Sequence, residues 1–458
     1  MIQNRLKNLI LIGGDVILLY LALFATLTIR YGGFPSENIR DQHFLPFSIL
    51  FIVWLVIFFI NGLYDLATSN NDIAFYNRIL TTLAIDFGAA AAYFYLLTDR
   101  LFSIKPQAVY FIFIGLVAVS FPLWRYWYNT FVQRPGMLRN VLIVGMNDEA
   151  KELIREIIKK PQLGYNIKAI MHAGLRKISD FPGVEIIKNS KDIQKLISEK
   201  KISTIVTAKD PHNNPEMVQQ LFHTVIMKVQ FFDLPTFYEK LTGKVPVTNI
   251  GHVWFLENLT ESEMGVFQIS KRLTDVLAAI FGLALSLPFI PLIALLIKID
   301  SKGPVFFTQI RTGHLGKTFK AVKFRSMIEG AENNGPQWAQ KQDPRATRIG
   351  KFLRRTRIDE IPQLLNVLAG EMAIIGPRPE RPEFVKNLQK IIPFYNERHL
   401  VKPGLTGWAQ INYQYGTSAA DALKKLQYDL FYIKNRSLSL DIGIALKTIK
   451  IMLSGKGH

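Results

Sequence analysis

The sequence predicts a membrane protein with three parts: an N-terminal four-helix transmembrane bundle, an α/β domain, and a mainly α domain with a re-entrant membrane helix. Of its 458 residues, 49% are hydrophobic, which is high for a soluble protein. Apolar segments of roughly 20 residues recur along the chain, the length that a membrane-crossing helix needs. The net charge is +19, and residues 301–458 carry +14 of it, from 26 Lys plus Arg against 12 Asp plus Glu. This charge predicts an anionic partner for the C-terminal part.

Four apolar segments predict four transmembrane helices within residues 1–130, at 9–29, 44–64, 80–98 and 107–124. Six basic residues, Arg125 among them, flank the ends on the N-terminal side of the membrane, and four flank the other ends. This bias favours a cytoplasmic N-terminus. Asp15 and Asp86 lie within the segments, where a carboxylate indicates either a functional site or a hydrogen bond between helices.

The residues from 139 to 255 predict a cytosolic α/β domain. Residues 140–150 have the pattern of a buried strand and a tight turn, and an amphipathic helix follows from Lys151, as at the start of a Rossmann-like unit. Further strands are expected at 167–172, 184–187, 204–207 and 229–232, with a helix at 192–200. The turn has Gly145 but not the later glycines of a dinucleotide-binding loop, which favours a structural or regulatory role over nucleotide binding.

A fifth apolar segment, residues 273–297, is long enough to span the membrane, but Pro288 and Pro291 interrupt it. Basic residues flank both of its ends, including Lys271 and Lys302, which favours leaving both ends in the cytoplasm. We therefore expect a re-entrant helix over residues 270–299, broken at Pro288. An ordinary fifth span is the alternative, and it would place the basic third of the chain outside the cell.

A pair of carboxylates, Asp359 and Glu360, precedes Pro362 and an apolar run that ends at Gly370, which predicts a helix start. At that position unpaired backbone N–H groups stabilise an anion, so we expect Asp359 to be ionised and the same helix end to be able to hold a phosphate. A carboxylate can also attack phosphorus covalently. In isolation such a pair more often caps a helix. Here it is accompanied by basic residues that suit a diphosphate, namely Lys323, Arg325, Arg354, Arg355, Arg357 and Arg378.

Five motifs follow the apolar hairpin in order. They are Gly303-Pro-Val-Phe-Phe-Thr-Gln, Lys323-Phe-Arg-Ser-Met, Phe352-Leu-Arg-Arg-Thr-Arg-Ile-Asp-Glu-Ile-Pro-Gln-Leu, Gly376-Pro-Arg-Pro-Glu and Lys402-Pro-Gly-Leu-Thr-Gly-Trp-Ala-Gln. Together they closely resemble the bacterial polyprenyl-phosphate sugar-phosphate transferases, the monotopic phosphoglycosyl transferases. The preceding layout resembles the long members of that family, which have four spans and a Rossmann-like, CoA-binding-like domain.

The resemblance implies a catalytic domain at 266–458 that transfers a sugar-1-phosphate from a UDP-sugar to undecaprenyl phosphate and releases UMP, at the cytoplasmic face of the bacterial inner membrane. It implies that Asp359 is the nucleophile and that Glu360 coordinates Mg²⁺ or supports acid/base chemistry, with both carboxylates as metal ligands. Lys323, Arg354 and Arg378 match basic family positions that neutralise phosphate charge, and Arg325 is a further, weaker candidate for binding phosphate. The family commonly breaks its re-entrant helix at Ser-Pro, whereas here Leu287 separates Ser286 from Pro288.

Two other classes of protein fit parts of the pattern. A membrane-bound nucleotide-sugar dehydratase or epimerase would need a Tyr-x-x-x-Lys pair, and no tyrosine after residue 265 has lysine four positions later. A non-enzymatic polysaccharide export scaffold would not need the carboxylate pair in a basic surround. Membrane lipid is an expected partner and nucleic acid is not, while homo-oligomerisation and the identity of the sugar stay open.

Overall fold

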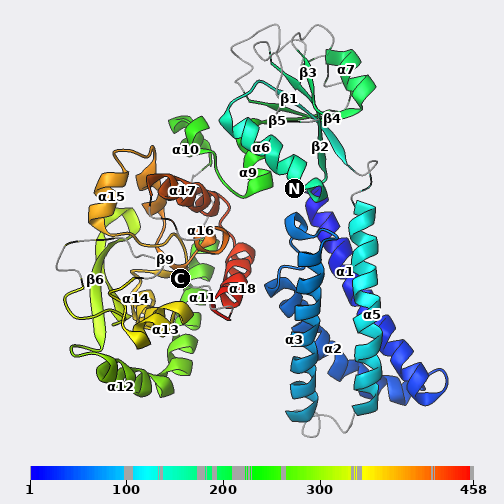
Figure 1. Cartoon of the computed structure of the whole chain (residues 1–458), viewed down its shortest axis with the longest axis horizontal. Coiled ribbons are helices and arrows are strands. Elements are labelled where there is room, and N and C mark those ends of the chain that lie inside the picture. Colours follow the sequence, from blue (N-terminus) through cyan, green and yellow to red (C-terminus); the bar gives the residue numbers. More distant parts are fainter. Residues whose placement is uncertain are drawn as a thin grey trace. The chain divides into compact units, whose positions relative to one another are not determined.

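The computed structural model describes residues 2–96, 107–132, 134, 138–172, 181, 183–187, 193–208, 222, 224, 227, 229–258, 265–331, 335, 337, 343–413, 416 and 418–453. The chain forms two compact units, Met1–Phe237 and Tyr238–His458. The first unit holds the N-terminal helices and a parallel sheet, and the second holds the motifs that the sequence singled out (Figure 1). The domain boundaries drawn from the sequence stay a prediction.

The four N-terminal apolar segments are all helical. They form α1 (Ile2–Tyr31), α2 (Glu37–Ile60), α3 (Ile73–Leu96) and α5 (Gln107–Val132). Length and composition alone make α1, α2 and α5 able to cross a membrane, together with the stretch from Gly265 to Asp300, whereas α3 is not among the four such helices of the described chain. The protein is therefore a membrane protein, and the role of α3 as a span stays a prediction.

An ion pair joins α1 to α5 in the interior of the bundle. Arg125 Nη2 lies 2.6 Å from Asp15 Oδ2, with both side chains fully buried, and Trp124 Nε1 donates to Asp15 Oδ1 at 3.0 Å. This contact favours the hydrogen-bond interpretation of Asp15. Counting Arg125 among the membrane flanks was wrong, because α5 continues past it to Val132 and the guanidinium pairs inside the bundle.

A five-stranded parallel sheet follows the bundle, with strand order β3-β2-β1-β4-β5 (Figure 1). The predicted strands and helices are present, with ends that differ by up to three residues. Asn147 caps the N-terminus of the first helix of this α/β domain, because its side chain accepts a hydrogen bond from Ala150 N at 2.8 Å. The elements are β1 (Arg139–Val144), α6 (Asp148–Lys159), β2 (Tyr165–Met171), β3 (Glu185–Ile187), α7 (Ile193–Lys200), β4 (Ile202–Thr207) and β5 (Gln230–Asp233).

The fifth apolar segment is broken where the prolines predicted. Helix α11 (Gly265–Ser286) ends in a short 3-10 turn (Leu287–Phe289), and α12 (Ile290–Asp300) leaves in a clearly different direction (Figure 1). Ser286 Oγ donates to Leu283 O at 3.0 Å, so this hydroxyl satisfies a carbonyl near the break although it is not adjacent to Pro288. Large apolar side chains stay exposed along both helices, such as Phe281 at 70% and Ile299 at 73%. Such a surface is suited to lipid.

The second unit is built from short elements around a β-hairpin. Segments before the membrane hairpin also belong to its core, since Val245 and Val247 are buried with Leu426 and Leu430. The elements are α9 (Leu234–Thr242), α10 (His252–Asn258), β6 (Phe306–Thr312), β7 (Thr318–Phe324), α13 (Arg348–Thr356), the 3-10 helix Ile358–Gln363, α14 (Leu364–Ala369), β8 (Ala373–Ile375), α15 (Pro382–Leu388), the 3-10 helix Tyr395–Leu400, β9 (Gly404–Thr406), α16 (Trp408–Asn412), α17 (Ala419–Lys434) and α18 (Leu438–Leu453).

Candidate active site

Asp359 and Glu360 lie in the first turn of the 3-10 helix Ile358–Gln363, directly before α14. Arg357 ends α13 in a left-handed conformation, with φ of 57°, and this sharp turn separates the basic helix from the dyad. Gly370 ends α14, also left-handed, with φ of 82°, where glycine carries no steric penalty. The predicted helix start and the C-terminal glycine are therefore confirmed, with a 3-10 turn in place of the first α turn.

Glu360 is the centre of a buried ion cluster. Lys323 Nζ donates to Glu360 Oε1 at 3.0 Å, and Arg378 Nη2 donates to the same oxygen at 2.7 Å. Burial opposes ionisation of Glu360, but the two cations outweigh it and hold the pKa of its carboxyl well below the usual range. Glu360 is thus a fixed anion that orients Lys323 and Arg378, residues that belong to different motifs.

Asp359 has a different environment. It is 7% exposed, and no side chain or backbone group of the described residues donates a hydrogen bond to its carboxylate. Burial raises the pKa of this carboxyl to about 6, although the charges of Lys323, Arg378 and Arg354 oppose the shift. Burial therefore outweighs any stabilisation of the anion by the helix start. The group is still mostly ionised at pH 7.5, and no partner has to be displaced before it attacks.

Two of the predicted phosphate-binding arginines lie around the dyad. Arg378 follows β8, which pairs in parallel with β9, so this pairing joins the Gly376 and Lys402 motifs. Behind it, Arg398 donates to Arg378 O at 3.0 Å and to Asp429 Oδ2 at 2.8 Å, which fixes the backbone that carries the site arginine. Arg354 lies on α13, and its Nη1 is buried without an acceptor among the described residues.

Arg325 is placed differently from the other basic candidates. Its guanidinium donates to Ser301 O at 2.6 Å and to Lys302 O at 2.8 Å, carbonyls that follow the end of α12. The side chain is 6% exposed and makes no contact with the dyad in the described structure. The structure therefore gives Arg325 a role in holding the end of α12 against β7, and it offers no phosphate-binding geometry there.

A small cavity lies at the dyad. It is lined by Arg311, Ala321, Lys323, Glu360, Gln363, Arg378, Pro379 and Gly404. Arg311 and Gln363 were not singled out in the sequence. Gln363 stands in the quoted dyad motif, three residues after Glu360, and the three-residue repeat of a 3-10 helix would have placed both on one face. Arg311 lies on β6 and donates to Pro379 O at 3.0 Å, and no sequence pattern pointed to it.

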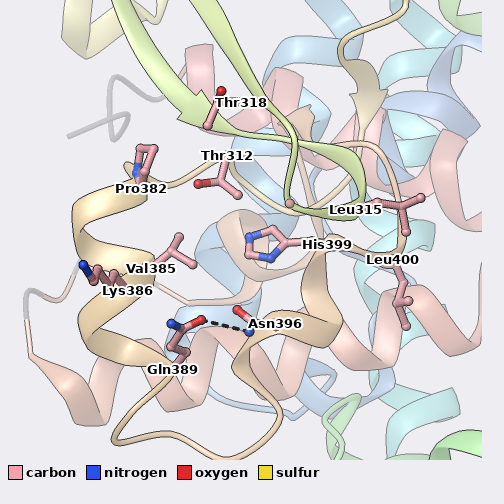
Figure 2. A pocket seen from close by; sticks show the side chains of 11 residues that line it. Thr312, Leu315, Thr318, Pro382, Val385, Lys386, Gln389, Asn396, His399 and Leu400 are labelled. Carbon is pink, nitrogen blue, oxygen red and sulfur yellow. Dashed lines mark hydrogen bonds between the residues drawn. The ribbon is translucent and has the colours of Figure 1, made fainter.

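A larger cavity of about 450 Å³ lies elsewhere in the second unit (Figure 2). It opens between the tip of the β6–β7 hairpin, α15 and the 3-10 helix Tyr395–Leu400. Thr312, His399 and Gln389 are among its lining residues, and Gln389 accepts a hydrogen bond from Asn396 at 2.9 Å (Figure 2). None of the sequence-predicted site residues lines this cavity. The smaller cavity is the one that contains the predicted site residues Lys323, Glu360 and Arg378.

The dyad carboxylates are the groups at this site that could hold a magnesium ion together with substrate. Mg²⁺ prefers oxygen ligands and is commonly held by one or two carboxylates together with substrate phosphates. Asp359 offers an unpaired carboxylate next to Glu360, and within the described chain no group of three or more histidine or acidic side chains could hold a metal by itself. Such an ion would neutralise phosphate charge beside the nucleophile.

Comparison with known proteins assigns the family. A family model described as "Bacterial sugar transferase" matches residues 266–455. The UDP-glucose:undecaprenyl-phosphate glucose-1-phosphate transferase of Klebsiella pneumoniae is 32% identical over 446 residues, which cover 92% of each chain. The chain belongs to the bacterial polyprenyl-phosphate sugar-1-phosphate transferases.

Two further relatives of this transferase match shorter parts of it. The UDP-N-acetylgalactosamine-undecaprenyl-phosphate N-acetylgalactosaminephosphotransferase of Aeromonas hydrophila is 42% identical over 237 residues, 52% of this chain and 55% of that protein. The UDP-glucose:undecaprenyl-phosphate glucose-1-phosphate transferase of Xanthomonas campestris pv. campestris is 34% identical over 340 residues, 70% of this chain and 67% of that protein. The names of these relatives thus differ in the sugar that is transferred, which is N-acetylgalactosamine in one and glucose in two.

Proposed function

We propose that this membrane transferase moves a hexose-1-phosphate from a UDP-sugar to undecaprenyl phosphate and releases UMP. Its family supports the reaction, and the relatives' names support both substrates. The single observation that carries the proposal for this site is that the two adjacent carboxylates differ in their ion-pair and hydrogen-bond partners. Glu360 is neutralised by two cations, while the neighbouring Asp359 has no partner among the described residues. Neither a dehydratase nor an export scaffold accounts for this arrangement.

The reaction proceeds in two displacements. In the first, an Asp359 carboxylate oxygen forms a bond to the β-phosphorus of the UDP-sugar, and the bond to the bridging oxygen breaks with its electron pair leaving on UMP. In the second, an oxygen of undecaprenyl phosphate attacks the phosphorus and the Asp359 carboxylate departs. Both displacements concentrate negative charge beside Lys323, Arg354 and Arg378, which compensate it.

Each residue of the ion cluster has a defined part in this scheme. Glu360 orients Lys323 and Arg378 through its shared oxygen. With Asp359 it would also hold Mg²⁺, which supplies charge neutralisation for the diphosphate when bound. Lowering the net charge at the phosphate favours attack by an anionic nucleophile, which would otherwise be repelled.

The same proposal places the site at the cytoplasmic face of the inner membrane. Helices α11 and α12 would enter the bilayer and return to the same face, with the break at Pro288 as the turning point. The N-terminal part of α11 is held by contacts with the rest of the unit. Lys271 Nζ donates to Asp441 Oδ2 at 2.8 Å, and Arg272 donates to Val367 O at 2.7 Å. The five-stranded sheet is proposed to be a Rossmann-like domain, as its strand order indicates.

A donor panel tests the proposal. The purified full chain is incubated with undecaprenyl phosphate, Mg²⁺ and, separately, UDP-glucose, UDP-galactose and their N-acetylated forms, and UMP release is measured. We expect release with at least one donor, dependent on Mg²⁺, and a lipid-linked sugar phosphate as the second product. Release of UDP in place of UMP would contradict the proposed phosphoryl transfer.

A further inference from the structure

The Gln363 side chain is a buried amide at the dyad cavity with no assigned part in the scheme above. It ends the 3-10 helix that carries the dyad and lines the same cavity as Lys323, Glu360 and Arg378. In a 3-10 helix, residues three apart lie on one face. Gln363 therefore shares its face of the helix with Glu360.

The amide nitrogen of Gln363 has no acceptor among the residues that the structure describes. The residue is 3% exposed, and its Nε2 is buried. A buried N–H donor without an acceptor is destabilising, and folded proteins rarely keep one unless a ligand, water or ion completes it. The position of this donor beside Lys323, Glu360 and Arg378 points to a substrate atom as the group that completes it.

The neighbouring cations indicate which substrate atom is the acceptor. Lys323 and Arg378 already donate to Glu360 Oε1, so they hold the anion of the dyad in place. The amide carries no charge and makes no such contact within the described residues. During phosphoryl transfer, negative charge is spread over the non-bridging oxygens of the transferred group. A fixed neutral donor stabilises these oxygens without forming an ion pair with the Asp359 carboxylate that attacks the phosphorus.

We propose that Gln363 is a catalytic residue whose Nε2 donates a hydrogen bond to a non-bridging oxygen of the transferred phosphoryl group. The inference rests on the proposed function. The contact is made while Asp359 oxygen bonds to the β-phosphorus and the bond to the UMP oxygen breaks, with the electron pair leaving on UMP. No proton is transferred from the amide, and the same contact is available when the lipid phosphate displaces Asp359.

The test compares Gln363→Met, which keeps the length of the side chain but removes the donor, with wild type. The full chain in lipid nanodiscs is mixed with the best UDP-sugar and Mg²⁺ without lipid acceptor, and the rate of the first UMP release is measured. We expect a loss of about 100-fold in rate, the usual effect of removing one such donor, with KM nearly unchanged. The Tm should not fall, because the variant removes an unsatisfied donor.

Gln389→Met is the matched control, because Gln389 lines the larger cavity (Figure 2), and neither dyad residue lines that cavity. It should release UMP at the wild-type rate. Gln363→Glu, which keeps the shape and presents an acceptor in place of the donor, should be slower than Gln363→Met. A rate for Gln363→Met within about threefold of wild type would overturn the inference.

Two other results would also overturn it. A loss of rate accompanied by a clear drop in Tm would assign Gln363 to packing. A loss seen with one donor sugar and absent with another would assign the amide to a sugar hydroxyl. If wild type releases no UMP from any UDP-sugar, the proposed function itself fails, and that result is distinct from a wild type that works and a Gln363→Met variant that works equally well.

Discussion

The two carboxylates of the dyad should respond in opposite ways to the same isosteric change. Asp359→Asn removes a buried charge that accepts no hydrogen bond from the described residues, while Glu360→Gln removes a charge that accepts hydrogen bonds from two cations. Both variants should lose transfer. Only the second should lose stability, because only Glu360 is compensated in the folded chain.

The size of the first effect follows from the pKa of Asp359, which burial raises from 3.8 to about 6. Each pKa unit corresponds to about 1.4 kcal/mol, so ionised Asp359 costs the fold about 3 kcal/mol above pH 6. Since the folded pKa lies above the unfolded one, this loss develops between about pH 4 and pH 6 and is absent at lower pH. Asp359→Asn should therefore unfold at a higher temperature than wild type at pH 7.5.

The size of the second effect follows from the partners of Glu360. Removing its charge leaves Lys323 and Arg378 close together without their shared carboxylate acceptor, and breaking a fully buried pair in this way typically costs about 3–5 kcal/mol. The Arg378 side chain is 26% exposed, so solvent screening reduces the expected loss to about 2–4 kcal/mol. Glu360→Gln should unfold at a lower temperature than wild type.

The assay is thermal unfolding of the three full-length proteins in nanodiscs at pH 7.5, with UMP release measured on the same samples. Opposite shifts in Tm with no turnover in either variant would agree with the structure. Equal destabilisation by both variants would refute the reasoning about Asp359, because its carboxylate would then have a stabilising partner. Near-normal transfer by Asp359→Asn would refute its role as nucleophile.

Three further predictions concern charge and topology. Because Asp359 must be deprotonated to attack, kcat/KM should rise with pH through about 6 and then level off, and a flat profile from pH 5 to 8 would contradict this. Lys323→Ala should lower kcat/KM by at least about tenfold, whereas Lys320→Ala, which changes an exposed residue of the same strand, should have little effect. In this cysteine-free chain, Ser270→Cys and Lys302→Cys, introduced singly, should both be protected from an impermeant maleimide in intact cells; labelling of position 302 alone would mean that α11 and α12 span the membrane.

The local structure was predictable from the sequence because it depends on neighbouring residues. The break at Pro288 follows from a missing backbone donor, and the end of α14 follows from the left-handed conformation of Gly370. The strands of the parallel sheet follow from short apolar runs separated by turns. Each of these features needs only a few consecutive residues to specify it.

The choice of partner for each charged side chain was not predictable in the same way. Arg125 and Arg325 both had the sequence context of exposed cations, yet one pairs with Asp15 and the other binds carbonyls after α12. Their partners lie 110 and 24 residues away in the chain. A motif therefore identifies which basic residues belong to the family pattern, but the fold decides which of them reach the phosphates.

The contacts of Arg325 also explain why a motif residue without a phosphate contact is placed between the membrane hairpin and the site. Arg325 lies two residues after Lys323, and it holds the carbonyls that follow α12, while Asp300 at the end of α12 accepts a hydrogen bond from Ile349 N at 2.8 Å. The end of the hairpin is thus bonded both to the strand that carries Lys323 and to the helix that carries Arg354. Lys323 approaches the dyad from β7 and Arg354 approaches it from α13. Because β7 and α13 are both bonded to the end of α12, the distance between the two cations depends on α12. The position of the end of α12 and the positions of Lys323 and Arg354 therefore depend on the same hydrogen bonds, so a shift of α12 should change the spacing of these two cations beside the dyad.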